Sequence, residues 1–228
     1  KMPIILEGVL KPGIFNIPGD ISSQFITGLL FTLPLLDGNS KINITTELQS
    51  QPYIMMTLQV LKEFGITIYY SPDDRTFGIP GNQRYNAVPY YAVEGDWSQA
   101  AFFCVMGALS GSVTVKGLSL DSLQGDKAII DILQKMGADI EIKEDEITVS
   151  KSNLNCTEID GSQIPDLIPV ISVAASIAKG ITVIRNAERL RIKESDRLAA
   201  TSSVINALGG RITERTDGLI IEGVPGLK

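Results

Sequence analysis

The stretch that decides the fold is LQKMGADIEI, residues 133–142, in which an apolar helical pattern ends at Gly137 and an alternating strand pattern begins. The same pattern recurs in LKEFGITIYY and INALGGRITE, around Gly65 and Gly209, and each of these glycines is 72 residues from Gly137. Glycine at a helix end suits the left-handed conformation that closes a helix. A fixed period of this kind predicts a fold built from repeated units.

Outward from these glycines, each repeat reads as a βαβαββ unit. A second set of glycines, Gly38, Gly111 and Gly180, precedes β-branched strands such as KINIT and ITVIR. The apolar run SSQFITGLLFTLPLL predicts a buried helix, and PYIMMTLQVLKEFG, with apolar residues at i, i+3, i+4 and i+7, predicts an amphipathic helix. Alternating segments such as EITVSK close each unit as strands. Three units are expected, at about 15–88, 89–151 and 156–224.

The linker GNQRYNAVPYYAVEGD separates the first two units. It is polar, contains Pro89 and lacks helical periodicity, which predicts a domain boundary near Ala92. We expect residues 1–92 to form part of a first lobe, with one complete βαβαββ unit and a preceding strand. Residues 93–228 are expected to form part of a second lobe with two units.

The composition is that of an ordinary globular protein, with 228 residues, 44% of them hydrophobic and 20% charged. The net charge of −6 and the lack of a basic run argue against nucleic-acid binding. No segment reaches the roughly 18 apolar residues of a membrane span, and no signal peptide is recognisable. The sequence therefore predicts a cytoplasmic protein without a membrane partner.

Cysteine and histidine usage limits the chemistry. Cys104 and Cys156 have no metal-like spacing, and Cys104 lies in the apolar run AAFFCVMGAL, which predicts a core position. The chain has no histidine, so proton transfer must use Asp, Glu, Lys or Tyr, and the commonest zinc ligand is missing.

The repeat alignment places polar residues at helix starts. The two sets of equivalent positions hold Gln24, Trp97 and Asp166, and Ser50, Ser122 and Glu194. Equivalent helix ends in a repeat fold tend to face one way, and helix N-termini suit anions. The sequence therefore indicates an anion site at these ends.

Most of these residues also have a simpler interpretation as helix-start signals. In GDISSQF, a single serine suffices as N-cap. In QSQPYIMM, Ser50 reads as N-cap before Pro52, and Tyr53 suits a core or a pocket. Asp166 suits the helix dipole, or its carboxylate serves as a base beside apolar residues.

The segment LRIKESDRL, residues 190–198, carries five charged side chains. Ser195 is expected to cap the following helix, with Asp196 in its first turn. Lys193 and Arg197 oppose the dipole of a helix start, and an anion bound by both explains them better.

These motifs resemble the 5-enolpyruvylshikimate-3-phosphate synthase (EPSP synthase) family of enolpyruvyl transferases. The similar segments are GDISSQF, SQPYIMMTLQVLKEFG, YAVEGDWSQAAFF, LQGDKAIIDILQKMGA, DGSQIPDLIP and LRIKESDRLAA, in the order of the family. The resemblance implies an α/β fold of six βαβαββ units in two domains, each an inside-out α/β barrel. Three units here imply an incomplete, internal fragment of a longer transferase.

The resemblance also implies the reaction. The family transfers the enolpyruvyl group of phosphoenolpyruvate to the 5-hydroxyl of shikimate 3-phosphate and releases phosphate, in the shikimate pathway that leads to chorismate and the aromatic amino acids. No metal or cofactor is implied. We expect a monomer whose partners are these two substrates, and no nucleic acid.

The site residues are carried over by motif. Ser22, Ser23 and Gln24 would hold shikimate 3-phosphate, with added contacts from Ser50 and Tyr53.

The catalytic residues implied are Asp166, Lys193 and Glu194. Asp166 would bind ring hydroxyls and accept a proton, Lys193 would bind near the 5-hydroxyl, and Glu194 would handle protons at the methylene carbon. Arg197 would grip the phosphoenolpyruvate carboxylate with its planar fork.

Departures from the family pattern bear on activity. The chain shows no counterpart of the family's N-terminal Lys-Ser motif, its Gly-Asn-Ala/Ser-Gly-Thr loop or its later Arg and Lys, so this chain alone is expected to be inactive. Trp97 stands where the family more often has a small residue, and Arg189 stands where some members use a polar contact. Two alternatives remain: a UDP-N-acetylglucosamine enolpyruvyl transferase, and a non-catalytic repeat protein with a binding role.

Overall fold

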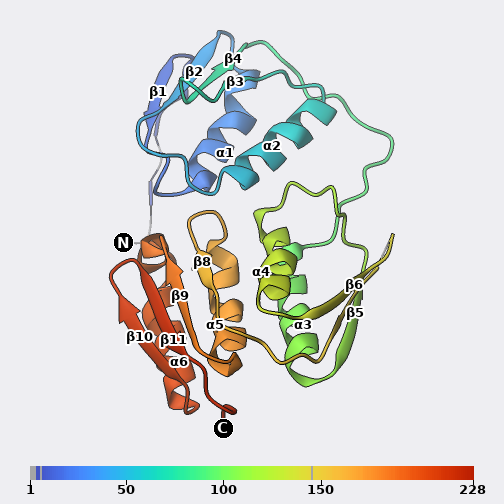
Figure 1. Cartoon of the computed structure of the whole chain (residues 1–228). Coiled ribbons are helices and arrows are strands. Elements are labelled where there is room, and N and C mark those ends of the chain that lie inside the picture. The colour runs from blue at the N-terminus through green and yellow to red at the C-terminus, as the bar shows by residue number, and fades with distance from the viewer. Residues whose placement is uncertain (1–3, 6, 145) are drawn as a thin grey trace. The chain divides into compact units, whose positions relative to one another are not determined.

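The computed structural model describes residues 4, 5, 7–144 and 146–228. The chain divides into two compact units, unit 1 (Lys1–Tyr91) and unit 2 (Ala92–Lys228). Figure 1 shows helices and strands in both units. That the units belong to two lobes of a longer protein, divided after residue 92, stays a prediction.

Unit 1 contains one complete βαβαββ repeat. Its elements are β1 (Ile14–Ile17), α1 (Ser23–Thr32), β2 (Ser40–Ile44), α2 (Gln51–Glu63), β3 (Tyr69–Ser71) and β4 (Thr76–Ile79), with a 3₁₀ turn at Leu33–Leu35 after α1. The sheet order is β1-β2-β4-β3. The first two strands are parallel, and the β2–β4 and β3–β4 pairs are antiparallel.

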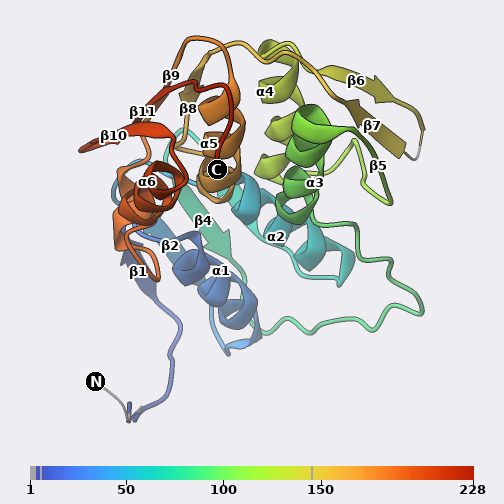
Figure 2. The ribbon, with the colours of Figure 1, turned by 90° about the horizontal axis from the view of Figure 1, so that it is seen from below.

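Alternation in the strands determines which face of this sheet is buried. In β2, Ile42 and Ile44 are buried, whereas Lys41 before them is exposed and Asn43 between them is only half-buried. The helices α1 and α2 lie side by side on one face of the sheet (Figures 1 and 2), and their apolar residues complete the core of unit 1. Burial of these apolar side chains is the main stabilising contribution.

Unit 2 contains a second complete repeat and most of a third. The complete repeat runs through β8 (Glu158–Asp160), α5 (Ile168–Ile177), β9 (Ile181–Arg185), α6 (Arg197–Ala207), β10 (Arg211–Arg215) and β11 (Gly218–Glu222). Its sheet order, β10-β11-β9-β8, is that of unit 1 read from the other edge, and β8 and β9 are parallel. The same unit has therefore formed twice from sequences with the same glycine spacing.

The middle repeat departs from the prediction. It consists of α3 (Trp97–Ser110), β5 (Ser112–Lys116), α4 (Ile129–Lys135), β6 (Asp139–Ile142) and β7 (Glu146–Ser150). No strand forms at 89–96, although one was expected to open this unit. Pro89 has no N–H to donate, and Gly95 makes a backbone hydrogen bond to the Gly117 carbonyl, 3.2 Å away. The sheet therefore has three strands, in the order β5-β7-β6.

The strand expected ahead of the first repeat is not formed in the described residues 4, 5 and 7–13. Residues 1–3 and 6, on which the same expectation falls, lie outside the described residues. The apolar residues of this segment do not form a strand by themselves, because a strand also needs a neighbouring strand to pair with.

Helices fill the interior of unit 2. Figure 1 shows α3 and α5 between the two sheets, and the core cluster of this unit draws on both helices and both sheets. Cys104 is fully buried there, as its apolar surroundings predicted. Among the described residues, no helix combines the length and the apolar character needed to cross a membrane.

The repeat glycines adopt the conformation that their position predicts. The φ angles of Gly65, Gly137 and Gly209 are 82°, 91° and 86°. Each lies in the left-handed region, which costs a residue with a Cβ more than it costs glycine. Glycine therefore recurs every 72 residues because each helix of this set ends in a left-handed backbone conformation.

Candidate active site

In unit 2, the candidate residues gather where two parallel strands end. The strands β8 and β9 run in the same direction, and α5 and α6 follow them, so the connecting segments 161–167 and 186–196 leave from the same edge of the sheet. The Asn186 side chain donates to Asp160 Oδ2 at 3.0 Å, and the Gly161 N–H donates to the Arg185 carbonyl at 2.8 Å. These bonds hold the two segments together.

Arg197 links both segments. Its Nη1 donates to Asp166 Oδ1 at 2.6 Å, and its Nη2 donates to Glu194 Oε2 at 2.8 Å. The Arg197 side chain is only 26% exposed, whereas those of Asp166 and Glu194 are 40% and 77% exposed. The structure thus brings together three residues that were selected from sequence positions up to 31 apart.

Lys193 belongs to the same cluster. Burial lowers the pKa of its ammonium group, as do the nearby charges of Arg189 and Arg197, and the carboxylates of Asp166 and Glu194 oppose this effect. A lysine with a lowered pKa exchanges protons more readily near neutral pH. The electrostatic environment therefore suits Lys193 to a proton-transfer role.

Glu194 is held in its charged form. A hydrogen bond from its own backbone N–H lowers the pKa of the carboxyl group, and the hydrogen bond and charge of Arg197 lower it further. A largely exposed carboxylate of this kind is an acceptor for a proton or a cation.

The other charged residues of LRIKESDRL stabilise the segment itself. Arg191 Nη1 lies 2.9 Å from Asp196 Oδ2 and 3.2 Å from Glu214 Oε2, and Arg191 also donates to the carbonyls of Thr216 and Arg215. These contacts fasten the segment to the β10–β11 hairpin. The charge run thus divides between a structural pair and the site.

The cap of α6 corrects one prediction. Asp196, not Ser195, is the N-cap residue, and its Oδ1 accepts from the Ala199 N–H at 3.0 Å. Serine and aspartate cap helices equally well, so the sequence alone did not decide between adjacent residues.

Arg189 was not among the predicted site residues, although the structure adds it to the cluster. It lies in the 3₁₀ turn Glu188–Ile192, its exposed fraction is only 6%, and its charge acts on Lys193. Its position four residues before Lys193 was visible in the sequence, but nothing there distinguished a buried arginine from a solvated one.

In unit 1, two helix starts lie at the same end. The strands β1 and β2 are parallel and lead into α1 and α2. The hydroxyls of Thr27 and Thr57, near the middle of α1 and α2, lie 3.4 Å apart, so the two helices are in contact. The loops before them are joined as well, because Thr46 Oγ1 accepts from the Gly19 N–H and donates to Asp20 Oδ1.

The serine and glutamine candidates occupy the start of α1. Ser22 is the N-cap, and its Oγ accepts from the Gln24 N–H at 3.3 Å, as the simpler interpretation required. Ser23 is half-buried at the first helical position, and Gln24 is exposed. Three hydrogen-bonding side chains therefore stand at one helix N-terminus.

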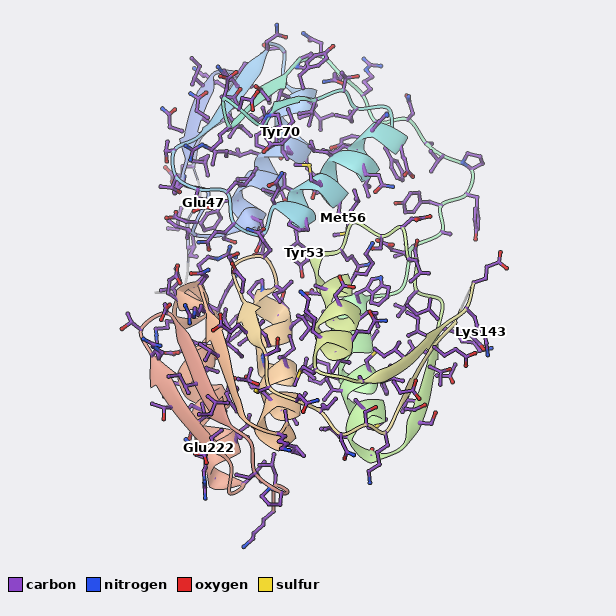
Figure 3. The ribbon with its side chains drawn as sticks, viewed as in Figure 1. Glu47, Tyr53, Met56, Tyr70, Lys143 and Glu222 are labelled. Carbon is purple, nitrogen blue, oxygen red and sulfur yellow. The ribbon has the colours of Figure 1, made fainter. Side chains whose placement is uncertain are left out.

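Ser50 and Tyr53 occupy the start of α2. Ser50 is at the N-cap position, but its φ of 53° lies in the left-handed region and its side chain makes no capping hydrogen bond. Tyr53, labelled in Figure 3, is half-buried, and its N–H donates to the Ser50 carbonyl at 3.2 Å. An unusual conformation at a helix start is a feature of functional sites.

The equivalent positions of the middle repeat have structural roles. Trp97 is fully buried, its indole N–H donates to the Ser119 carbonyl at 3.1 Å, and its backbone N–H donates to the Gln124 side chain. Ser122 is also buried. The predicted site residues therefore form one set in unit 1 and one in unit 2, and the middle repeat contributes core.

Solved structures share this architecture. EPSP synthase from Acinetobacter baumannii superimposes with a TM-score of 0.76 at 25% identity, over 94% of this chain and 49% of that one. The enolpyruvyl transferase NikO from Streptomyces tendae gives a TM-score of 0.69 at 19% identity, over 95% and 52%. The fold is that of the enolpyruvyl transferase class.

Sequence comparison narrows the class. The profile of the family described as EPSP synthase (3-phosphoshikimate 1-carboxyvinyltransferase) matches residues 1–228. The chain belongs to the EPSP synthase family, which confirms the resemblance found in its motifs.

Curated relatives carry the same name. The chain is 56% identical to the 3-phosphoshikimate 1-carboxyvinyltransferase of Clostridium beijerinckii, over 97% of this chain and 51% of that protein. It is 53% identical to that of Clostridium botulinum (strain Alaska E43), over 100% and 52%. The chain spans about half the length of the curated relatives it matches.

Proposed function

We propose that the complete protein containing this chain is a 3-phosphoshikimate 1-carboxyvinyltransferase. It joins the enolpyruvyl group of phosphoenolpyruvate to the 5-hydroxyl of shikimate 3-phosphate and releases phosphate. The observation that carries the proposal is the cluster of Lys193 and Arg197 with Asp166 and Glu194 at one sheet edge. Cations bind the anionic substrates there, and carboxylates beside them move protons.

The unit 1 residues are assigned to the acceptor. The hydroxyls of Ser22 and Ser23 and the amide of Gln24, at a helix N-terminus, are donors suited to a phosphate group. Ser50 and Tyr53 add contacts from the neighbouring helix start.

The unit 2 residues are assigned to the reacting atoms. In the addition step, the 5-oxygen bonds to the central carbon of phosphoenolpyruvate. The hydroxyl proton passes to Asp166, with Lys193 close to that oxygen. Glu194 takes up a proton once the substrate carboxylate replaces it at Arg197, and then delivers that proton to the methylene carbon. Arg197 binds the carboxylate of phosphoenolpyruvate.

Elimination reverses the proton movements. The carbon–oxygen bond to phosphate breaks, the methyl carbon returns a proton to Glu194, and the double bond re-forms in the product. The proton held by Asp166 passes to the departing phosphate, which returns Asp166 to its carboxylate form. Both proton transfers are assigned to carboxylates and Lys193, consistent with a chain that has no histidine.

The test is phosphate release by the product of the complete gene. Release is expected only when shikimate 3-phosphate and phosphoenolpyruvate are both present, and Arg197→Ala is expected to lower it by about 100-fold or more because the carboxylate loses its charged fork. Arg185→Ala, which removes an exposed arginine of β9, is the matched control. Release with UDP-N-acetylglucosamine in place of shikimate 3-phosphate would contradict the proposal.

We also infer that the complete protein acts as a monomer in the cytoplasm. The assigned groups come from one chain, and both substrates are small molecules. Light scattering of the complete protein tests the monomer, and fractionation of cells tests the compartment.

A further inference from the structure

Arg197 already holds two carboxylates. Its Nη1 contacts Asp166 at 2.6 Å, and its Nη2 contacts Glu194 at 2.8 Å. A guanidinium grips an incoming carboxylate best with two parallel N–H donors aimed at the same ligand. In this structure the two terminal nitrogens serve different residues, so a substrate carboxylate that takes these same two N–H donors has to displace both.

Asp166 is the stronger competitor. Its contact with Arg197 is the shorter of the two, and its side chain is 40% exposed, whereas that of Glu194 is 77% exposed. Solvent screens the more exposed ion pair more effectively. The availability of Arg197 therefore depends mainly on Asp166.

We propose that Asp166 occupies Arg197 in the substrate-free protein, and that binding of the acceptor at Asp166 frees the guanidinium for the carboxylate of the second substrate. This inference rests on the proposed function, in which Asp166 binds the acceptor hydroxyls. A hydroxyl that donates to the Asp166 carboxylate takes up part of its hydrogen-bonding capacity, and its hold on Arg197 weakens.

The consequence is a coupling between the two substrate sites. An acceptor that releases Arg197 raises the affinity for the second substrate, and the second substrate must raise the affinity for the acceptor by the same factor. Asp166 lies just before α5, and Arg197 is the first residue of α6. A change in the hydrogen bonds of one therefore affects the other without a large movement of either helix.

The experiment measures this coupling by titration calorimetry on the complete protein. The probe is 2-phospholactate, which retains the carboxylate and phosphate of phosphoenolpyruvate but has no double bond to react. Its affinity for the unmodified protein is expected to rise at least tenfold when shikimate 3-phosphate is saturating.

Asp166→Asn removes the charge and retains a hydrogen-bonding side chain. In this variant, 2-phospholactate is expected to bind severalfold more tightly without the acceptor, and the gain on adding acceptor is expected to fall below twofold. The matched control is Glu214→Gln, which removes the same charge from Arg191 instead, at 3.2 Å, and is expected to retain the full gain.

The outcomes separate the two proposals. Equal affinity of 2-phospholactate with and without acceptor, or a full gain in Asp166→Asn, would overturn the coupling while leaving the proposed function in place. Failure of the unmodified protein to bind shikimate 3-phosphate would overturn both. A crystal structure of the complete protein with acceptor alone gives a test that needs no variant, because the Asp166–Arg197 hydrogen bond is expected to be broken, and its persistence would contradict the inference.

Discussion

Two arginines six residues apart show how the same side chain serves different ends. Arg191 binds Asp196, Glu214 and two backbone carbonyls, so its donors are used to fix the chain. Arg197 donates to two side-chain carboxylates, those of Asp166 and Glu194, and substrates can displace such groups. At the scale of residues, the partner of a charge rather than its presence separates a structural role from a chemical one.

Arg189 is predicted to tune Lys193. Burial is the largest cause of the lowered Lys193 pKa and the charge of Arg189 is the next, so Arg189→Gln is expected to raise that pKa toward the ordinary lysine value. A higher pKa leaves less neutral amine, and competitive acetylation of Lys193 at pH 8, followed by mass spectrometry, is expected to slow. Arg185→Gln is the control, and an unchanged rate in Arg189→Gln would contradict the prediction.

Cys104 is predicted to be unreactive in the folded protein. Burial raises the pKa of its thiol from 9.0 to about 11. At pH 8, a disulfide reagent is expected to label the exposed Cys156 and to label Cys104 only after denaturation, as mass spectrometry of the two peptides would show. Because the folded-state pKa is raised, the stabilising contribution of the protonated thiol is complete below pH 9 and is lost between about pH 9 and 11. Equal labelling of both thiols at pH 8 would contradict burial.

At the scale of elements, the repeat depends on how its helices end. The helix-closing glycines have positive φ values, but their surroundings differ. A Cβ at Gly209 would meet nothing within 4 Å, whereas one at Gly65 would lie 2.2 Å from Asn86 Nδ2. The cost of replacing them therefore separates into a backbone contribution, common to both, and a steric contribution at Gly65.

Alanine substitutions test this separation. Gly209→Ala is expected to lower the free energy of unfolding by about 1 kcal/mol, and Gly65→Ala by about 2 kcal/mol because Asn86 must also move. Gly28→Ala, inside α1 and with open space around the new Cβ, is expected to stabilise by about 0.5–1 kcal/mol. Urea unfolding measures all three, and destabilisation by Gly28→Ala would show that propensity does not determine the sign there.

On the scale of the whole molecule, unit 2 has an uncovered apolar groove of about 590 Å³ along α3, α5 and α6. Phe102, Met106 and Val204 line it and are each about half exposed. Exposed apolar patches mark contacts with other protein surfaces. Since the matched relatives are about twice as long as this chain, the remaining part of the complete protein is expected to cover the groove.

Charged substitutions in the groove test whether it is covered. Met106→Glu and Val204→Glu are each expected to lower the free energy of unfolding of the complete protein by about 2–4 kcal/mol, because an unpaired charge would be buried. Ser203→Glu, on the same helix but outside the groove lining, is expected to be tolerated. Equal melting temperatures for Val204→Glu and Ser203→Glu would show that the groove stays open to solvent.

The expected inactivity of this chain alone also belongs to this scale and stays a prediction. Phosphate release by the isolated, folded chain, compared with the complete protein at equal concentration, measures it. Turnover by the isolated chain would show that residues 1–228 contain every group that the reaction needs.

Most of the correct fold prediction came from the 72-residue spacing of the repeats and from the backbone conformation that favours glycine at helix ends. The spacing of Gly65, Gly137 and Gly209 predicted the repeat, because a left-handed helix end constrains the residue type. The prediction of a strand at 89–96 was wrong, because a strand forms only beside a partner strand, and the local sequence does not show whether one is available. Which carboxylate each arginine meets was also hidden, because Asp166 and Arg197 are brought together only by the parallel pairing of β8 and β9.

The buried position of Trp97 has a spectroscopic consequence. It is the only tryptophan of the chain, and it lies in unit 2, whereas all six tyrosines, at positions 53, 69, 70, 85, 90 and 91, lie in unit 1. Emission from this buried indole therefore reports on the unfolding of unit 2, and tyrosine emission reports on unit 1. The efficiency of energy transfer from the tyrosines to Trp97 therefore measures the distance between the two units without an attached label.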